Sequence, residues 1–263
     1  MSINAKHRPR KRFGQNFLQN QTVIDDIVRA IGPARDDCMV EIGPGLGALT
    51  EPLARALNQL HVIELDRDIV AAMQGRYANV TIHAGDALKF DFASLGNELR
   101  ANLRVVGNLP YNISTPLLFH LAGNAAHLRD IHAMLQKEVV DRMIAAPGGS
   151  DYGRLSVMLQ YRFEMEKVLD VGPEAFHPKP KVDSAVVRIV PRVQIDPIAR
   201  DEAVFARVVT AAFSQRRKTL RNTLRNILDL TDFEALGIDP GARGETLSVA
   251  DFVRISNHAG LAG

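Results

Sequence analysis

The chain has 263 residues, of which 46% are hydrophobic and 24% charged, and its formal net charge is only +2. This length allows one large core and a smaller second domain. Cys38 is the single cysteine, which excludes an internal disulfide and a cysteine-based metal site, and no apolar run reaches the ~20 residues of a membrane-spanning helix. We therefore expect no metal and no membrane partner, and we further expect a monomer in the cytoplasm.

The N-terminal segment is basic. No acidic residue precedes Asp25, whereas the first twelve positions contain Lys6, Arg8, Arg10, Lys11 and Arg12. The segment lacks the apolar run of a secretory signal and is short and poor in serine for a transit peptide. We assign residues 1–12 to a basic arm.

Residues 13–193 have the pattern of one α/β domain. From Gln21 to about Arg188, short apolar runs alternate with longer amphipathic segments, which is typical of helices packed on a mainly parallel sheet. The last two predicted strands are joined by a stretch with glycine and proline, so we expect an antiparallel end to the sheet. The predicted strands are Cys38–Ile42, Leu60–Leu65, Val80–Ala84, Leu103–Gly107, Ile131–Gln136, Ser156–Glu164 and Val182–Val190. They predict a seven-stranded, Rossmann-like sheet.

A glycine-rich turn follows the first predicted strand, with Gly43, Gly45 and Gly47 at alternate positions. In open α/β sheets, ligands bind at this carboxyl edge, and glycine lets the backbone turn tightly and approach a ligand closely. Glu64 lies about 20 residues further on, at the end of the next strand, where a carboxylate can accept both hydroxyl protons of a ribose.

Two features favour S-adenosylmethionine over a dinucleotide as the ligand of this turn. The glycine spacing is not the Gly-x-Gly-x-x-Gly of a pyrophosphate site, and Glu41 precedes it. Asp86 follows the third strand, where a short carboxylate can accept from an adenine amine. The alternative is that Glu64, Asp66 and Asp86 are solvated loop acids.

The run Asn108–Tyr111, with the sequence Asn-Leu-Pro-Tyr, directly follows the fourth predicted strand. An exocyclic adenine amine is a poor nucleophile because its lone pair is delocalised, so it must be held with its protons accepted. The Asn108 side-chain oxygen and the Leu109 carbonyl can each accept one N–H. Pro110 stiffens the loop and Tyr111 offers a stacking face. The alternative is an ordinary turn with a packing tyrosine.

Residues 194–263 have helical periodicity and predict a small all-helical domain. Apolar residues recur at steps of three and four between Phe205 and Phe213. Basic residues then occupy a stretch without acids: Arg216, Arg217, Lys218, Arg221 and Arg225. Because Arg217, Arg221 and Arg225 repeat every four residues, we expect a stripe along one helix. The stripe suits RNA contact, and the alternative is a solvated face.

Four runs of this sequence resemble the ribosomal RNA adenine dimethyltransferases, and among them most closely the bacterial enzymes of the small subunit. The runs are Phe13–Leu18 (FGQNFL), Asn108–Ser114 (NLPYNIS), Phe176–Ser184 (FHPKPKVDS) and Phe213–Asn222 (FSQRRKTLRN). The resemblance covers nearly the whole chain.

This resemblance implies an enzyme that uses S-adenosylmethionine to dimethylate N6 of two adjacent adenosines in the 3′-terminal hairpin loop of 16S rRNA. The substrate would be the small ribosomal subunit or its precursor, and the activity would have a role in its maturation. The implied cofactor residues are Asn16 and Leu18 closing over it, Gly43 and Gly45 beside it, Glu64 on the ribose, Asp86 on the adenine and Asn108 at the methyl-transfer point. Phe176 would stack on the target adenine opposite Tyr111.

Three other functions remain open. A large-subunit rRNA adenine methyltransferase of the macrolide-resistance type shares the motif set, but the run Phe213–Asn222 favours the small-subunit type. A DNA adenine methyltransferase could use the same acceptor tetrapeptide, although no separate DNA-reading module is visible. A non-catalytic nucleic-acid-binding relative, the mitochondrial transcription factor, is disfavoured by the intact run Asn108–Tyr111.

Overall fold

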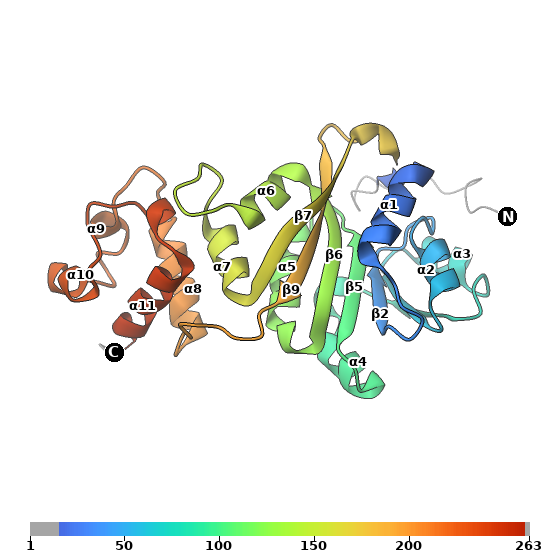
Figure 1. Ribbon diagram of the computed structural model, residues 1–263, viewed down its shortest axis with the longest axis horizontal. Coiled ribbons are helices and arrows are strands. Elements are labelled where there is room, and N and C mark those ends of the chain that lie inside the picture. The colour runs from blue at the N-terminus through green and yellow to red at the C-terminus, as the bar shows by residue number, and fades with distance from the viewer. Residues whose placement is uncertain (1–15, 261–263) are drawn as a thin grey trace. The chain divides into compact units, whose positions relative to one another are not determined.

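The computed structural model describes residues 16–260, which form two compact units (Figure 1). The sheet unit contains residues 16–140 and 164–191, and the helical unit contains residues 141–163 and 192–260. The boundary at Pro191 lies near the predicted one, but residues 141–163, which we assigned to the first domain, group with the helical unit. The predicted basic arm and the start of the run Phe13–Leu18 lie outside the described residues.

The sheet unit is built around a sheet of seven strands in the order β4-β3-β2-β5-β6-β9-β7. Its strands are β2 Met39–Ile42, β3 Leu60–Glu64, β4 Val80–Ala84, β5 Leu103–Asn108, β6 Leu128–Gln136, β7 Phe163–Val171 and β9 Ser184–Pro191. Its helices are α1 Gln21–Ile31, α2 Thr50–Ala56, α3 Arg67–Met73, α4 Phe92–Leu99, α5 Ser114–Gly123 and the start of α6 Lys137–Ile144. The predicted seven-stranded Rossmann-like sheet is confirmed, as is its antiparallel end, since β9 runs antiparallel to β6.

A second, two-stranded sheet joins distant parts of the sheet unit. Strand β1, Phe17–Leu18, pairs antiparallel with β8, Phe176–His177, so that Leu18 lies opposite Phe176. The backbone N–H groups of Gln19 and Asn20 both donate to the carbonyl of Ala175, at 2.8 and 3.3 Å. The segment that precedes α1 is thereby held against the segment that precedes β9.

Side chains alternate between the two faces of a strand, so the register decides which polar groups share a face. Glu41 is the partner of Val62 on β3 and of Val106 on β5, and the partner of Asn108 is Met134. Glu41, Glu64 and Asn108 therefore point to the same face as Val62, Val106 and Met134.

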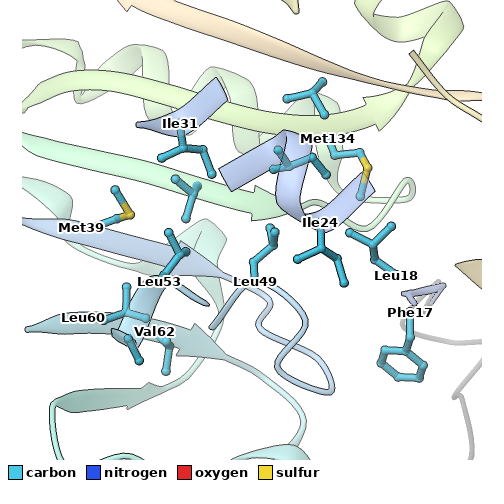
Figure 2. Close-up of a cluster of buried hydrophobic side chains, with 14 of the residues drawn as sticks. Phe17, Leu18, Ile24, Ile31, Met39, Leu49, Leu53, Leu60, Val62 and Met134 are labelled. Atoms are coloured by element: carbon cyan, nitrogen blue, oxygen red, sulfur yellow. The ribbon is translucent and has the colours of Figure 1, made fainter. Parts of the chain in front are cut away.

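Helices α1, α2 and α3 cover that face. Ile24 and Ile31 of α1 pack with Met39, Leu60 and Met134 of the strands, as Figure 2 shows. Helix α1 begins after Asn20, whose side chain accepts from Val23 N at 3.2 Å, and ends at Gly32, which has a left-handed φ of 55°. The core thus fills the middle of the face and leaves its carboxyl edge for polar side chains.

A buried ion cluster attaches the C-terminal end of α1 to the start of β5. The Arg104 side chain is 6% exposed, and its Nε donates to both carboxylate oxygens of Asp130 at 3.0 and 3.1 Å. Nη1 donates to Asp37 at 2.6 Å, and Nη2 donates to the carbonyl of Ile31 at 2.6 Å. Removing one of these partners would leave the buried Arg104 charge incompletely compensated and would destabilise the fold.

The helical unit has its own core. Its helices are α7 Arg154–Arg162, α8 Glu202–Ala212, α9 Leu220–Thr223, α10 Leu230–Leu236 and α11 Val249–Ala259, with the end of α6. Val157 and Tyr161 of α7 are buried with Phe205 and Val208 of α8 and with Phe252 of α11. The ring centroids of Tyr161 and Phe205 lie 4.7 Å apart.

The predicted strand Ser156–Glu164 is wrong for most of its length. Residues 154–162 form α7, and the strand β7 begins only at Phe163. Gly153 is the N-cap of this helix, and its backbone N–H donates to the Ser156 hydroxyl at 3.0 Å. A run of mixed apolar residues does not distinguish a buried strand from a buried helix by periodicity alone, and here the N-terminal cap and the packing on α8 favour the helix.

The predicted stripe of Arg217, Arg221 and Arg225 along one helix is also wrong. Helix α8 ends at Ala212, and only Arg221 lies in a helix, the single turn α9. The backbone N–H groups of Leu220 and Arg221 donate to the carbonyls of Ala242 and Pro240, at 2.8 and 3.0 Å. Because these donors are taken by another segment, a continuous helix through residues 213–228 cannot form.

Candidate functional site

The glycine-rich turn after β2 has a backbone that other residues would not readily adopt. Gly43, Gly45 and Gly47 have φ angles of 68°, 54° and 91°, in the region that L-residues with a Cβ rarely enter. A Cβ on Gly45 would also lie 3.1 Å from the ring of Phe17. The glycines therefore let the turn lie directly against the segment before α1.

A cavity of about 320 Å³ opens at this carboxyl edge, within the sheet unit. Every residue that we assigned to the cofactor from the sequence lies around it: Asn16, Leu18, Gly43, Gly45, Glu64, Asp86 and Asn108. So do Leu109 and Tyr111 of the acceptor run. The parallel strands β2, β3, β4 and β5 bring most of these residues together because their carboxyl ends lie side by side, whereas Asn16 and Leu18 reach the cavity from the segment of β1. The role of each residue remains a prediction.

Two buried carboxylates face this cavity. Glu64 is 8% exposed, and its Oε1 accepts from the backbone N–H of Asp66 at 2.7 Å. Burial raises the pKa of Glu64. Burial likewise raises the pKa of Glu41, which is 2% exposed, to about 7, and the nearby charge of Glu64 adds to the effect. Among the described residues, no hydrogen-bond donor reaches Glu41 Oε2.

Asp86 and an apolar neighbour complete this end of the cavity. The Asp86 side chain accepts from the backbone N–H of Leu88 at 3.0 Å, as the cap of the 3₁₀ helix Ala87–Lys89. Leu65 is 51% exposed and lies on the cavity wall beside Glu64. Glu41 and Leu65 also lie around the cavity, although the sequence did not lead us to name them as site residues. For Leu65, the available signal was an apolar residue directly after Glu64.

The end of β5 and the acceptor run that follows it, Asn108–Tyr111, contact both neighbouring strands, β2 and β6. A Cβ on Gly107 would lie 2.5 Å from the carbonyl oxygen of Ile42, so β5 passes β2 at a distance that only glycine permits. On the other side, the backbone N–H of Leu109 donates to the Met134 carbonyl at 3.1 Å. The Asn108 amide nitrogen donates to the Asn16 carbonyl at 3.0 Å. This contact engages only the nitrogen, and the amide oxygen Oδ1 is not used in it.

Tyr111 is fixed at both ends. Its carbonyl accepts from the Ser114 hydroxyl at 3.1 Å, and its phenol oxygen lies 2.8 Å from the Ser184 hydroxyl. Burial raises the pKa of Tyr111. The ring is therefore neutral at physiological pH and lies on the cavity wall in one orientation.

The comparisons with known proteins show the family to which the chain belongs. The family model for ribosomal RNA adenine dimethylase matches residues 6–260. The chain belongs to this family. Ribosomal RNA small subunit methyltransferase A of Aromatoleum aromaticum is 62% identical over 97% of this chain and 95% of its own length, and that of Chromobacterium violaceum is 60% identical over 97% of each.

Two solved structures have the same fold as this family member. A dimethyladenosine transferase from Plasmodium falciparum has a TM-score of 0.76 and 26% identity, covering 91% of this chain and 95% of the other. A 23S rRNA methyltransferase has a TM-score of 0.70 with 23% identity, covering 93% of this chain and 100% of the other, which shows the fold alone.

Phe176 is placed differently from the other predicted residues of this dimethylase. It is 5% exposed, lies in β8 opposite Leu18, and packs within the core cluster that contains α1. It is not among the residues around the cavity. The structure therefore does not bring Phe176 and Tyr111 together around the cavity.

The predicted RNA-binding residues are exposed on the helical unit. They differ in their contacts. Arg216 donates to the Ser150 carbonyl and lies 3.9 Å from Glu245. Within residues 16–260, no ion pair or side-chain hydrogen bond occupies Arg217, Lys218, Arg221 or Arg225.

Neither a metal-ligand cluster nor a candidate membrane-spanning helix occurs in the described part of the chain. In residues 16–260, no group of three or more His, Cys, Asp or Glu side chains is arranged to hold a metal ion. No helix in that part of the chain is long and apolar enough to cross a membrane.

Proposed function

We propose that this protein transfers methyl groups from S-adenosylmethionine to N6 of two adjacent adenosines in the 3′-terminal hairpin loop of 16S rRNA, giving N6,N6-dimethyladenosine. The observation that carries the proposal is the position of the Asn108 amide, at the end of β5 and on the wall of the cavity that the glycine turn forms. Family membership and relatives named ribosomal RNA small subunit methyltransferase A support the substrate. The product would serve small-subunit maturation.

The cavity suits a cationic nucleoside ligand. When bound, the cofactor supplies a methyl group on a positively charged sulfur. Glu64 would accept protons from the ribose hydroxyls, and Asp86 would accept from the adenine amine. Leu65 gives an apolar surface for the adenine ring. The otherwise unpartnered Oε2 of Glu41 provides negative charge beneath the glycine turn, where a cation offsets the cost of burying a carboxylate.

The acceptor end would hold the target amine. Because the Asn108 nitrogen donates to Asn16, the amide oxygen is free to accept one N6 proton, and the Leu109 carbonyl accepts the other. Drawing both protons away turns the nitrogen lone pair out of conjugation and towards the methyl group, and such positioning supplies much of the rate. The extra N6 proton becomes acidic once the methyl is bound and leaves to solvent, so no dedicated base is needed. Tyr111 would stack on the base.

RNA binding would fall to the helical unit and to the N-terminal basic arm. A base cannot enter the cavity while it is stacked, so the RNA must present it from a loop or have it flipped out, and backbone contacts must hold the rest. The exposed side chains of Arg217, Lys218, Arg221 and Arg225 suit phosphate contact. We propose that the protein acts as a monomer in the cytoplasm.

Salt dependence tests the RNA contacts. Replacing Arg217, Arg221 and Arg225 together with alanine should weaken RNA binding, leave cofactor affinity unchanged, and reduce the slope of log affinity against log salt by roughly 0.7 to 0.9 for each phosphate that the variant no longer neutralises. The control is the double alanine variant of Arg29 and Arg55, whose side chains are 76% and 74% exposed on the sheet unit, and it should keep the wild-type slope. A triple variant with the wild-type slope would show that these arginines are only solvated.

Transfer of a labelled methyl group tests the function. We expect activity on small subunits that lack the modification, and little on large subunits, naked rRNA or duplex DNA. Asn108→Ala should reduce the single-turnover rate at saturating cofactor by roughly 10²- to 10³-fold, as expected when one positioning hydrogen bond is removed, with RNA binding retained. Preferred transfer to the large subunit or to DNA would refute the proposed substrate, and an Asn108→Ala rate within about threefold of wild type would refute the role of Asn108.

A further inference from the structure

The run Phe176–Ser184 ends in a serine that the proposed chemistry does not use. Ser184 is fully buried, is the first residue of β9, and is not among the residues around the cavity. Its hydroxyl nevertheless lies 2.8 Å from the phenol oxygen of Tyr111, which is on the cavity wall. We infer that Ser184 is a positioning residue, which holds the Tyr111 ring in the orientation that receives the target adenine. This inference rests on the proposed function.

The antiparallel strand explains how a buried serine reaches this edge. Parallel strands end at the carboxyl edge of the sheet, whereas an antiparallel strand begins there. Ser184 is the register partner of Gln136, the last residue of β6. The backbone N–H of Lys137 donates to the Asp183 carbonyl at 2.9 Å, which fixes the start of β9 against the end of β6. The Ser184 hydroxyl is therefore attached to the rigid sheet and not to the loop that it supports.

Tyr111 needs such an anchor because it lies in a short turn between β5 and α5. The turn is closed by the bond from Ile113 N to the Pro110 carbonyl at 3.1 Å, and the Ser114 hydroxyl holds the Tyr111 carbonyl. These contacts fix the backbone but leave the side chain free to rotate about χ1. The bond to Ser184 removes that freedom. A ring held in place before the base arrives does not lose rotational entropy when the base stacks on it.

Ser184→Ala should slow single-turnover methyl transfer at saturating RNA and cofactor by about 3- to 10-fold, the range of one buried neutral hydrogen bond. Cofactor affinity should stay unchanged because Ser184 does not contact the cavity. Tyr111→Phe removes the same hydrogen bond from the other side and should slow transfer by a similar factor. The double variant should be no slower than the slower single variant, because both changes remove the same bond.

The control is Ser256→Ala. Ser256 is 2% exposed in α11 of the helical unit and donates to the Val253 carbonyl at 2.8 Å, so its replacement reports the effect of removing a buried serine hydroxyl that has no contact with Tyr111. We expect a wild-type transfer rate for this variant. Effects of Ser184→Ala and Tyr111→Phe that multiply in the double variant would overturn the inference, as would a Ser184→Ala rate within about twofold of an active wild type.

Two other results need separate interpretation: a Ser184→Ala variant that does not fold, and a wild-type protein without activity. If Ser184→Ala does not fold, Tyr111→Phe carries the test alone, and a Tyr111→Phe enzyme with the wild-type rate overturns the inference. Failure of the proposed function is a different result, since it shows in the wild-type protein as an absence of transfer to small-subunit RNA.

Discussion

Replacing Gly107 by alanine should disturb the sheet at the centre of the candidate site. An added Cβ would lie 2.5 Å from the Ile42 carbonyl oxygen and 3.1 Å from Cδ2 of Leu109. The Leu109 side chain can move, but the Ile42 carbonyl belongs to the backbone of β2, which pairs with β3 and β5 on its two sides. Relief of the contact therefore requires β2 and β5 to separate.

Overpacking of this kind costs about 1–3 kcal/mol, and we expect the upper half of the range because both atoms are on strands that cannot move alone. For a chain of this size, a loss of about 2–3 kcal/mol corresponds to a fall in melting temperature of roughly 4–12 °C. The separation also displaces Gly43, which follows Ile42, so affinity for S-adenosylmethionine should fall as well. Thermal unfolding with and without cofactor measures both effects.

Gly123→Ala is the matched control. Gly123 is the last residue of α5, and a Cβ there would meet nothing within 4 Å. Alanine in place of glycine should leave stability unchanged or raise it by up to about 1 kcal/mol. Gly107→Ala could instead melt at the same temperature as Gly123→Ala and bind the cofactor as tightly as wild type. That result would show that the close approach of β2 and β5 does not exclude a side chain at residue 107.

Three further predictions concern buried charges. Glu64→Ala should weaken cofactor binding by about 1.5–3 kcal/mol, measured by calorimetric titration, and unchanged affinity in a folded variant would remove Glu64 from the site. Folding raises the pKa of Glu41 from 4.5 to about 7, so the folded state holds this proton more tightly. The free energy of unfolding should therefore fall as pH rises between these values, by at most about 3.4 kcal/mol. The free energy of unfolding of Glu41→Gln, measured at pH 5 and pH 8, should lack this part of the pH dependence. The same pH dependence in the variant and the wild type would contradict the raised pKa of Glu41. Asp130→Asn should destabilise the protein by about 2–4 kcal/mol because Arg104 stays buried with an incomplete set of partners, whereas Glu166→Gln, in an exposed pair with Arg188, should cost less than about 1 kcal/mol in the same denaturant titration.

The sequence predicted the parts of this structure that depend on local pattern. Strand β3 is a buried, mostly apolar run and strand β4 alternates apolar and polar residues, and the observed bounds of both agree with the predicted ones to within a residue. The carboxyl ends of parallel strands meet at one edge, so the order of strands alone brought Glu64, Asp86 and Asn108 to one place.

Features that depend on contacts between distant segments were not predicted. The break between α8 and α9 arises because Ala242 and Pro240 take the backbone donors of Leu220 and Arg221, and a spacing of four residues carries no information about that competition. The contact of Ser184 with Tyr111 spans 73 positions in the chain. The pKa of Glu41 depends on complete burial, which its place in the motif did not reveal.

The route of the chain between its two units decides how this enzyme can be shortened. The chain passes from one unit to the other after Val140, after Phe163 and after Pro191. Ending it at Pro191 would remove α8 and α11 but keep α7, whose Val157 and Tyr161 would lose the partners that bury them. A minimal catalytic fragment therefore requires two cuts, with residues 141–163 removed along with the C-terminal part and Val140 rejoined to Glu164.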